Sequence, residues 1–164
     1  MVDDLEFMKI LVVYYSRDGS TRKVAEELKA QLGADIEEIT ESKGRGGPLG
    51  WIRSGKEASS GAVVPINSPK ADPSTYDLVA VGTPIWAWNV SSPVRSYITA
   101  MRGKLPRIAF FCSMDSKSGD TFKVMEGLAG KPPVAMVGMT GSDVKSGNYK
   151  EKLKTFAEAI KSAI

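Results

Sequence analysis

The chain has 164 residues, of which 42% are hydrophobic, a length and composition that predict one domain with a substantial core. It contains no histidine and one cysteine, Cys112, which excludes an internal disulfide, a His/Cys zinc site and a Ser-His-Asp triad. A net charge of +3 without a dense basic stripe argues against nucleic-acid binding, and no apolar run approaches the ~20 residues of a membrane helix.

The first seven residues are acidic and mixed, unlike the basic and then apolar pattern of a signal peptide. We therefore expect a soluble, cytoplasmic protein that forms a single domain over residues 1–164. Residues 1–7 are expected to be a loosely ordered N-terminal extension.

The first strand is predicted over residues 10–15, an apolar run followed by the turn Ser16-Arg17-Asp18-Gly19-Ser20-Thr21 and then by a helix. A helix N-terminus has unpaired backbone N–H groups and the positive end of the helix dipole, so it attracts anions. Hydroxyl donors and a flexible glycine suit a phosphate, although an ordinary capped turn explains the same residues equally well.

The helix predicted over residues 21–32 has Val24, Leu28 and Leu32 on one face and ends at Gly33. A short strand is expected over residues 36–39, at a sheet edge because it contains two glutamates.

The segment 42–61 is the least regular, with several glycines ahead of a weak helix, and we expect a mobile loop and an imperfect helix there. It nearly matches the nucleotide-triphosphate P-loop over residues 50–57, but Glu57 replaces the magnesium-binding hydroxyl and no apolar strand precedes it. Its basic side chains could dock an acidic partner or a pyridine-nucleotide phosphate, although solvated side chains are the simpler interpretation; they are Lys43, Arg45, Arg53 and Lys56.

Three more strands follow, each with a helix behind it. They are predicted over residues 78–81, 108–112 and 134–137, and the helices carry apolar residues at helical spacing. The first of these helices begins with Ser92 as N-cap and Pro93, and the last begins with a capping box formed by Asn148 and Glu151.

Five strands alternating with helices indicate an α/β fold: a parallel sheet with helices on both faces and right-handed crossovers. Ligands of such sheets bind beyond the carboxyl ends of the strands, where the winding direction changes. With the strand order 2-1-3-4-5, three loops meet there: residues 16–21, 83–92 and 113–120.

The middle loop contains Trp86 and Trp88 at the expected ligand edge. Two tryptophans in such a loop favour a flat aromatic partner, because an indole ring covers one side of a fused ring system well. The alternative is that one of the two packs beneath the loop.

Together these stretches resemble the flavodoxin-like FMN proteins of the short-chain type. The residues that carry the resemblance are 16–21, similar to the phosphate loop [ST]-x-T-G-x-T, Tyr76–Pro84 leading into Trp86, and Phe110–Ser113 ahead of a polar loop. The resemblance implies a three-layer sandwich with a five-stranded sheet of order 2-1-3-4-5 and a bound FMN.

Carried over by position, the resemblance assigns the phosphate, the ring with its ribityl chain, and the pyrimidine edge of FMN to the three loops. The predicted cofactor-binding residues are Ser16, Arg17, Asp18, Gly19, Ser20 and Thr21; Thr83, Pro84, Ile85, Trp86, Ala87, Trp88 and Asn89; and Cys112, Ser113, Met114 and Asp120. Asn89 is the residue at which a peptide flip towards the ring is expected, because asparagine tolerates positive φ.

The chain departs from the family pattern at several points. Asp18 stands where threonine is common, so its carboxylate is expected to turn away from the phosphate, and Arg17 adds a positive charge beside it. The third loop has no tyrosine, and the basic surface differs from the acidic docking surface usual in flavodoxins.

The resemblance implies an electron carrier that exchanges electrons with redox partner proteins, because a flavin supplies the redox chemistry and the protein tunes it. The alternative is an FMN-dependent NAD(P)H:quinone oxidoreductase on the same fold, and a third possibility is a binding module that has lost the flavin. We assign no redox role to Cys112, since a lone cysteine at the end of a buried strand usually packs as a small apolar residue.

Overall fold

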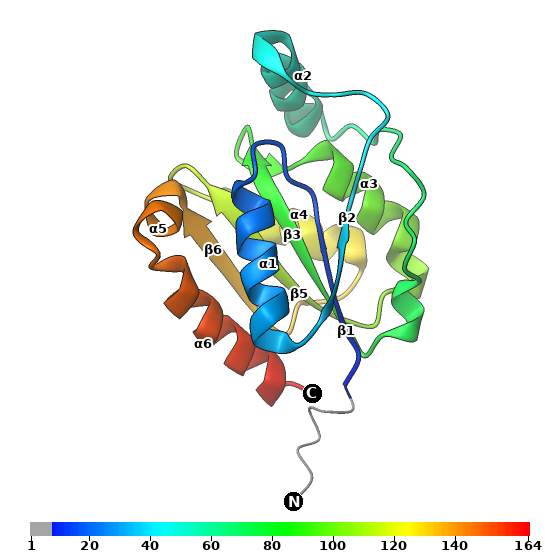
Figure 1. Cartoon of the computed structure of the whole chain (residues 1–164). Helices are drawn as coiled ribbons and strands as arrows, with labels where there is room; N and C mark the ends of the chain where they lie inside the picture. Colours follow the sequence, from blue (N-terminus) through cyan, green and yellow to red (C-terminus); the bar gives the residue numbers. More distant parts are fainter. Residues whose placement is uncertain (1–7) are drawn as a thin grey trace, which may run out of the picture.

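The structure, a computed structural model that describes residues 8–164, is built around a parallel sheet whose central strands are almost entirely apolar (Figure 1). The strands are β1 (Ile10–Tyr14), β2 (Asp35–Glu38), β3 (Leu78–Trp86), β4 (Asn89–Val90), β5 (Arg107–Met114) and β6 (Met136–Thr140). The α-helices are α1 (Ser20–Leu32), α2 (Gly47–Ser60), α3 (Ser92–Met101), α4 (Thr121–Ala129), α5 (Gly141–Ser146) and α6 (Tyr149–Ser162). Two short 3-10 helices, Pro73–Thr75 and Arg102–Lys104, connect them.

The parallel strands follow the order β2-β1-β3-β5-β6, which confirms the predicted order 2-1-3-4-5 for the five long strands. The short strand β4 is an addition that the sequence did not predict. It pairs antiparallel with the end of β3, so that β3 and β4 form a hairpin joined by Ala87 and Trp88.

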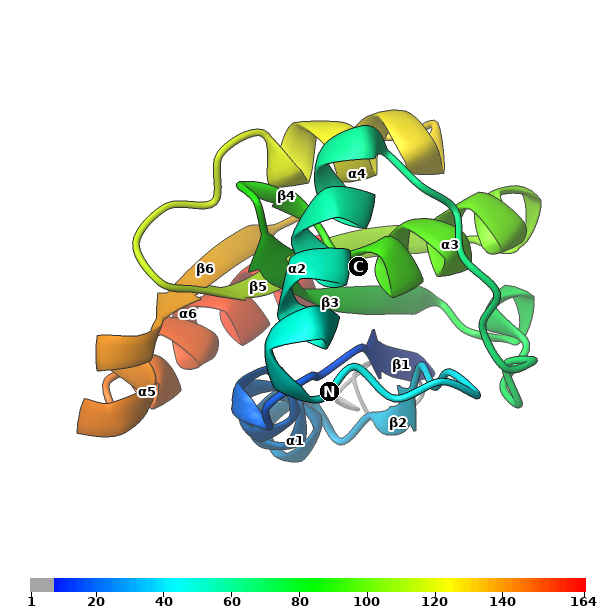
Figure 2. The same cartoon turned by 90° about the horizontal axis from the view of Figure 1, so that it is seen from above.

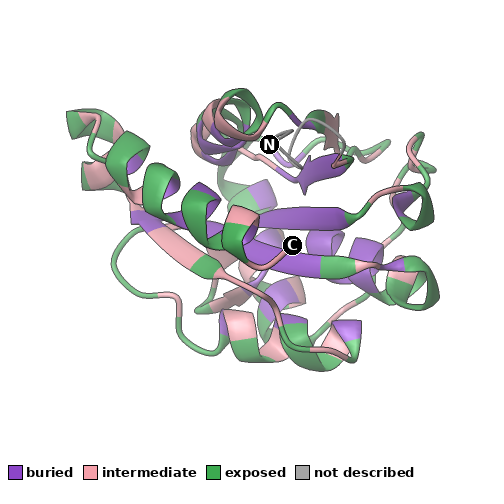
Figure 3. Ribbon diagram, turned by 90° about the horizontal axis from the view of Figure 1, so that it is seen from below, coloured by how far each residue is buried: buried purple, intermediate pink, exposed green. Residues whose placement is uncertain are grey.

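Alternate residues of β1 point to opposite faces of the sheet and so create two cores. Val12 packs with α1 and α6, whereas Val13 packs with α3 and α4. Figure 3 shows the sheet buried between these two helical layers. Because both faces are covered, ligand access is left to the edges of the sheet, above all to the loops at the carboxyl ends of the strands.

Helix α2 corrects the expectation of an imperfect helix within residues 42–61. It runs unbroken for 14 residues and projects from the body of the molecule over the carboxyl end of the sheet (Figures 1 and 2). Its buried face consists of Gly50, Ser54 and Ala58, at intervals of four residues. The buried positions of α2 do follow the helical period, but they hold small residues. A search for periodic hydrophobic residues therefore does not detect them.

The last strand begins later than predicted. Residues 134–135 already bond to β5, through Val134 N to Ile108 O (2.8 Å) and Phe110 N to Ala135 O (3.0 Å), but the regular strand β6 starts at Met136.

The capping box predicted at Asn148 and Glu151 is wrong. It forms instead at Thr140 and Asp143, the start of α5, where each side chain accepts a hydrogen bond from the other residue's backbone N–H (3.0 and 2.9 Å). Asn148 has helical backbone angles and makes no capping bond, because the short helix α5 leads almost directly into α6.

Residues 1–7, predicted to be an extension, lie outside the described part of the chain. Within residues 8–164, no helix combines the length and the apolarity needed to cross a bilayer.

Candidate functional site

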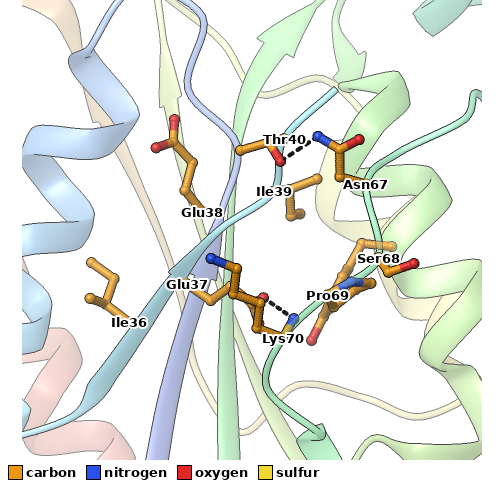
Figure 4. A pocket seen from close by; sticks show the side chains of 10 residues that line it. Ile36, Glu37, Glu38, Ile39, Thr40, Asn67, Ser68, Pro69 and Lys70 are labelled. Atoms are coloured by element: carbon orange, nitrogen blue, oxygen red, sulfur yellow. Dashed lines mark hydrogen bonds between the residues drawn. The ribbon is translucent and has the colours of Figure 1, made fainter. Parts of the chain in front are cut away.

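Two cavities differ in what surrounds them. One, of about 530 Å³, lies between β2 and the segment 67–70. Figure 4 shows this segment running beside β2, where Asn67 donates to Thr40 (Nδ2–Oγ1, 2.9 Å) and the backbone of Lys70 bonds to Glu37. The segment thus covers part of the open edge of β2, and this cavity is the gap left between them.

The second cavity, of about 710 Å³, lies where the sequence places the ligand, at the carboxyl ends of β1, β3 and β5. Its volume is within the usual range for sites of small molecules and cofactors. The lining residues come from the three predicted loops and from α2 and α5: Arg17, Asp18 and Ser20; Trp51, Ile52, Ser54, Gly55 and Lys56; Pro84, Ile85, Trp86, Ala87 and Trp88; Ser113, Met114, Asp115, Ser116 and Lys117; Gly141 and Val144.

Ten of the predicted cofactor residues line this cavity: Arg17, Asp18 and Ser20 in the first loop, Pro84, Ile85, Trp86, Ala87 and Trp88 in the second, and Ser113 and Met114 in the third. The other predicted residues do not line it. They are Ser16, Gly19 and Thr21 around the start of α1, Thr83 and Cys112 inside strands, Asn89 in β4, and Asp120, the N-cap of α4. The structure therefore brings all three loops together around one space.

The first loop is closed by its own side chains. Ser16 Oγ accepts hydrogen bonds from the backbone N–H groups of Gly19 (3.1 Å) and Arg22 (3.2 Å). Gly19 has a φ of 99°, which glycine adopts without strain, and a side chain there would meet open space. Thr21 Oγ1 lies 2.7 Å from Ser113 Oγ, a hydrogen bond that joins the first loop to the third.

The two charged residues of the loop point in different directions. The Arg17 guanidinium donates to the carbonyl oxygens of Arg45 (3.1 Å) and Gly47 (3.3 Å), at the start of α2. The Asp18 carboxylate, expected to turn away from a phosphate, bonds within the loop: its Oδ1 accepts a hydrogen bond from the backbone N–H of Ser20 (3.0 Å), in the first turn of α1. A carboxylate thus occupies a donor in the predicted phosphate loop.

The two tryptophans of the β3–β4 hairpin have different surroundings. Trp86 meets Tyr15 edge to face, with ring centroids 5.5 Å apart, and the Arg45 guanidinium lies 4.9 Å from its ring centre. Trp88, by contrast, is 69% exposed. The alternative that one tryptophan packs beneath the loop therefore describes Trp86, while Trp88 is free to contact a ligand.

The backbone between these tryptophans is unusual. Ala87 and Trp88 have positive φ values of 50° and 58°, the signs that a two-residue type I′ hairpin turn requires. Asn89, the residue expected to allow a peptide flip, is not in this conformation. Its side chain instead accepts a hydrogen bond from Val90 N (2.8 Å) and donates one to Ala58 O of α2 (3.4 Å).

Arg45 is the centre of a buried ionic cluster. It is 4% exposed and pairs with Glu41 (Nε–Oε1, 2.6 Å) and Glu57 (Nη2–Oε2, 2.7 Å), and it also donates to the hydroxyls of Ser54 and Ser92, both at 3.2 Å. Burial lowers the pKa of Arg45, but hydrogen bonds to the two glutamates raise it by more than burial lowers it. The pKa of Arg45 is therefore raised overall, and the side chain stays charged. The interpretation of Arg45 as a solvated residue of a basic loop is therefore wrong.

Helix α2 supplies a wall of the cavity that the sequence did not predict. Trp51, Ile52 and Lys56 line the cavity from α2, and Trp51 is 68% exposed. The signal that could have revealed this wall is the pair of large apolar residues, Trp51 and Ile52, opposite the small-residue face of the helix. Sequence alone does not show which way that face turns.

Cys112 is fully buried, and burial raises the pKa of its thiol to about 12. It is consequently protonated at neutral pH and packs in the core, as predicted for a small apolar residue. Burial, and secondarily the charge of Glu41, likewise raises the pKa of Tyr15 to about 12, so that a neutral phenol stands beneath Trp86.

No curated protein matches the chain significantly. Among solved structures, the fold is similar to that of a flavoprotein from Lactobacillus acidophilus in complex with FMN (TM-score 0.71, 20% identity, covering 85% of this chain and 97% of that one). It is also similar to a provisionally assigned flavoprotein from Bacteroides uniformis (TM-score 0.75, 20% identity, 92% and 98%) and to two-electron reduced Megasphaera elsdenii flavodoxin (TM-score 0.57, 17% identity, 91% and 98%).

At such identities these likenesses establish the fold. The sequence itself matches the family model described as flavodoxin over residues 9–160, nearly the whole chain. The strand order, the turn after β1 and the two further loops at the same sheet edge all fall within that match. The chain therefore belongs to the flavodoxin family.

Proposed function

We propose that the chain binds FMN in the 710 Å³ cavity and transfers electrons through it between redox partner proteins. The observation that supports this most is the convergence of the loops after β1, β3 and β5 on one space that also opens onto the N-terminus of α1. When bound, FMN supplies the redox chemistry, and the protein positions and tunes it.

The residues present fit this cofactor. The turn with Gly19 in its φ of 99° leaves open space at the N-terminus of α1, where a phosphate is favoured by backbone N–H groups and the helix dipole. Trp88 offers an exposed aromatic side chain, and the third loop borders the cavity with residues 113–117. The Thr21–Ser113 hydrogen bond keeps the first and third loops together.

The proposal is tested by titrating FMN into the purified protein and following flavin fluorescence. We expect saturable binding of one FMN per chain with loss of flavin fluorescence, because a ring against Trp88 is quenched by stacking. Replacing Trp88 with alanine should weaken FMN binding about fivefold, since an aromatic contact contributes roughly 1 kcal/mol. A protein that stays colourless and leaves free FMN fluorescent would contradict the proposal and support the binding-module alternative.

A second candidate function is NAD(P)H:quinone reduction by the same flavin. The wall formed by Trp51, Ile52 and Lys56 favours it, because it adds an apolar and basic surface to the cavity beyond the three loops assigned to FMN. Steady oxidation of NADPH that is stimulated by a quinone would support the reductase. In that case Trp51→Ala should slow turnover at unchanged FMN content, whereas a carrier should show no such turnover.

A further inference from the structure

The carboxylate of Asp18 lies at the first turn of α1. Asp18 Oδ1 lies 3.0 Å from the backbone nitrogen of Ser20, and Asp18 lines the cavity. A helix N-terminus has only a few unpaired N–H groups, and a bound phosphate depends on them. The carboxylate of Asp18 therefore occupies one of the donors that a phosphate in this loop would use.

Neither neighbouring arginine neutralises this carboxylate. Arg17 donates to two carbonyl oxygens at the start of α2, and Arg22 pairs with Glu38 (Nη2–Oε1, 2.6 Å) while its Nε donates to Tyr14. Among the described residues, Asp18 takes part in no salt bridge. Arg17, Lys56 and Lys117 line the same cavity, but none of them forms an ion pair with Asp18, so a phosphate at this loop meets a carboxylate with no direct salt-bridge partner.

The other polar groups of the loop would not relieve this repulsion by rearranging. The Ser16 hydroxyl oxygen accepts from Gly19 N and Arg22 N, and the Thr21 hydroxyl bonds with Ser113. These contacts keep the loop in its shape and hold residue 18 beside the helix N-terminus.

We propose that Asp18 is a specificity-determining residue that weakens the binding of the flavin phosphate, an inference that rests on the proposed function. Its carboxylate competes for the Ser20 N–H and repels the phosphate, so the loop discriminates less between FMN and riboflavin than a neutral loop would. FMN is then an exchangeable cofactor rather than a permanently retained one.

The test compares Asp18→Asn with the wild type. Asparagine has the same shape and can still accept from Ser20 N, so the loop is retained while the charge is removed. The dissociation constants of FMN and riboflavin are measured by flavin fluorescence at fixed ionic strength. We expect FMN to bind about tenfold more tightly to the variant, because a like charge a few ångströms away is removed. Riboflavin, which has no phosphate, should change less than about twofold.

The control is Glu158→Gln, which removes a carboxylate from the exposed face of α6, outside the cavity. Its ratio of riboflavin to FMN dissociation constants should equal that of the wild type, which separates a local effect of Asp18 from a change in net charge. Asp18→Thr, a second neutral variant, should also tighten FMN binding. Thermal unfolding of each apoprotein verifies that the variants are folded.

Each outcome is decisive. Equal or weaker FMN binding by Asp18→Asn overturns the role of Asp18 and leaves the proposed function intact, provided that the wild type binds FMN. Binding by the variant but not by the wild type supports the inference in its strongest form. Failure of every folded variant to bind FMN refutes the proposed function and the inference with it.

Discussion

At the scale of single residues, Arg45 connects parts of the chain that are distant in sequence. It joins Glu41, Glu57 of α2 and Ser92 at the start of α3, and its guanidinium lies over Trp86 at the cavity. One buried cation thereby determines where α2 attaches and how a cavity-lining ring is held. Such a cluster fixes the positions of the segments that it joins, because an arrangement that left a buried charge unpaired would be strongly destabilising.

Replacing Arg45 with methionine should lower the free energy of unfolding by about 3–5 kcal/mol, because two largely buried carboxylates lose their partner. Urea denaturation followed by fluorescence measures this loss. The matched control is Arg53→Met, which removes another cation from Glu57 but one whose side chain is 37% exposed. Its loss should be below about 1 kcal/mol. Equal losses in the two variants would show that burial of the Arg45 cluster is not what stabilises α2.

Cys112 should be inert in the native protein. Its thiol is fully buried and its pKa is raised to about 12, so almost no thiolate forms at neutral pH. A colorimetric disulfide reagent at pH 8 should therefore react at a negligible rate until guanidinium unfolds the chain, and should then release one equivalent of chromophore. Rapid reaction of the folded protein would contradict the burial of this residue.

At the scale of elements, α2 is attached at both ends. Arg17 donates to Gly47 O at its start, and Asn89 donates to Ala58 O near its end. Arg45 binds Ser54 and Glu57 between them. Between these contacts Gly50 lies so close to the backbone that a Cβ would stand 2.2 Å from the Arg45 carbonyl oxygen. The small-residue face thus lets the helix approach the body and directs Trp51 and Ile52 to the cavity.

Two glycines of α2 provide a matched pair of substitutions. Gly50→Ala should destabilise the protein by about 1–3 kcal/mol, because the new methyl group collides with backbone that cannot move easily. Gly55→Ala should instead stabilise it by about 0.5–1 kcal/mol, since nothing lies within 4 Å of the added Cβ and alanine favours the helix. Denaturant unfolding measures both. Equal effects in the two variants would contradict the close approach at Gly50.

The sequence predicted the parallel strands because their signals are local: apolar runs, glycine stops and loops of hydroxyl residues. Their order was an implication of the resemblance to the flavodoxin-like proteins. Helix α2 and strand β4 were harder to predict for physical reasons. The buried face of α2 uses Gly50, Ser54 and Ala58, which carry no hydrophobic periodicity, and β4 has only two residues, Asn89 and Val90. Both are specified by contacts with the rest of the fold.

The candidate site was predicted in the same uneven way. The three loops follow from topology, since the carboxyl ends of parallel strands meet at one edge. The directions of Arg17 and Asp18 depend on neighbours brought by the fold, namely the carbonyl oxygens of Arg45 and Gly47 for the first and the Ser20 N–H for the second. The directions of these two side chains therefore cannot be predicted from the order of residues within the turn.

At the scale of the whole molecule, acid should weaken the fold through specific carboxylates. The hydrogen bond from Lys152 and the backbone N–H of Thr140 lower the pKa of Asp143. For Glu57, partial burial raises the pKa, but hydrogen bonds from Ser92 and Arg45 lower it by more, so that its pKa is also lowered. Both groups bind fewer protons in the folded than in the unfolded state. The stability that they contribute is therefore present above the unfolded pKa and is lost as the pH falls below it.

Asp143→Asn tests this dependence at the junction of β6 and α5. At pH 7 the variant should be less stable by about 1 kcal/mol or less, because the ion pair with Lys152 is partly exposed. The difference from the wild type should shrink as the pH falls from about 5 towards 2, where the wild-type carboxylate becomes protonated on unfolding. Unfolding midpoints in urea across this range measure it, and a difference that grows in acid would contradict the assigned shift.

The hairpin between β3 and β4 has a consequence for what selects its residues. Left-handed backbone at Ala87 and Trp88 costs about 1–3 kcal/mol per residue, and Asn-Gly would form the same turn with little strain. Trp88 regains little of this by burial, since it is 69% exposed. At residue 88, where glycine would be the most stable choice for the backbone, the chain has tryptophan, the largest side chain. The proposed contact of Trp88 with FMN would account for this choice. Trp88→Gly should therefore raise the free energy of unfolding while weakening the binding of FMN.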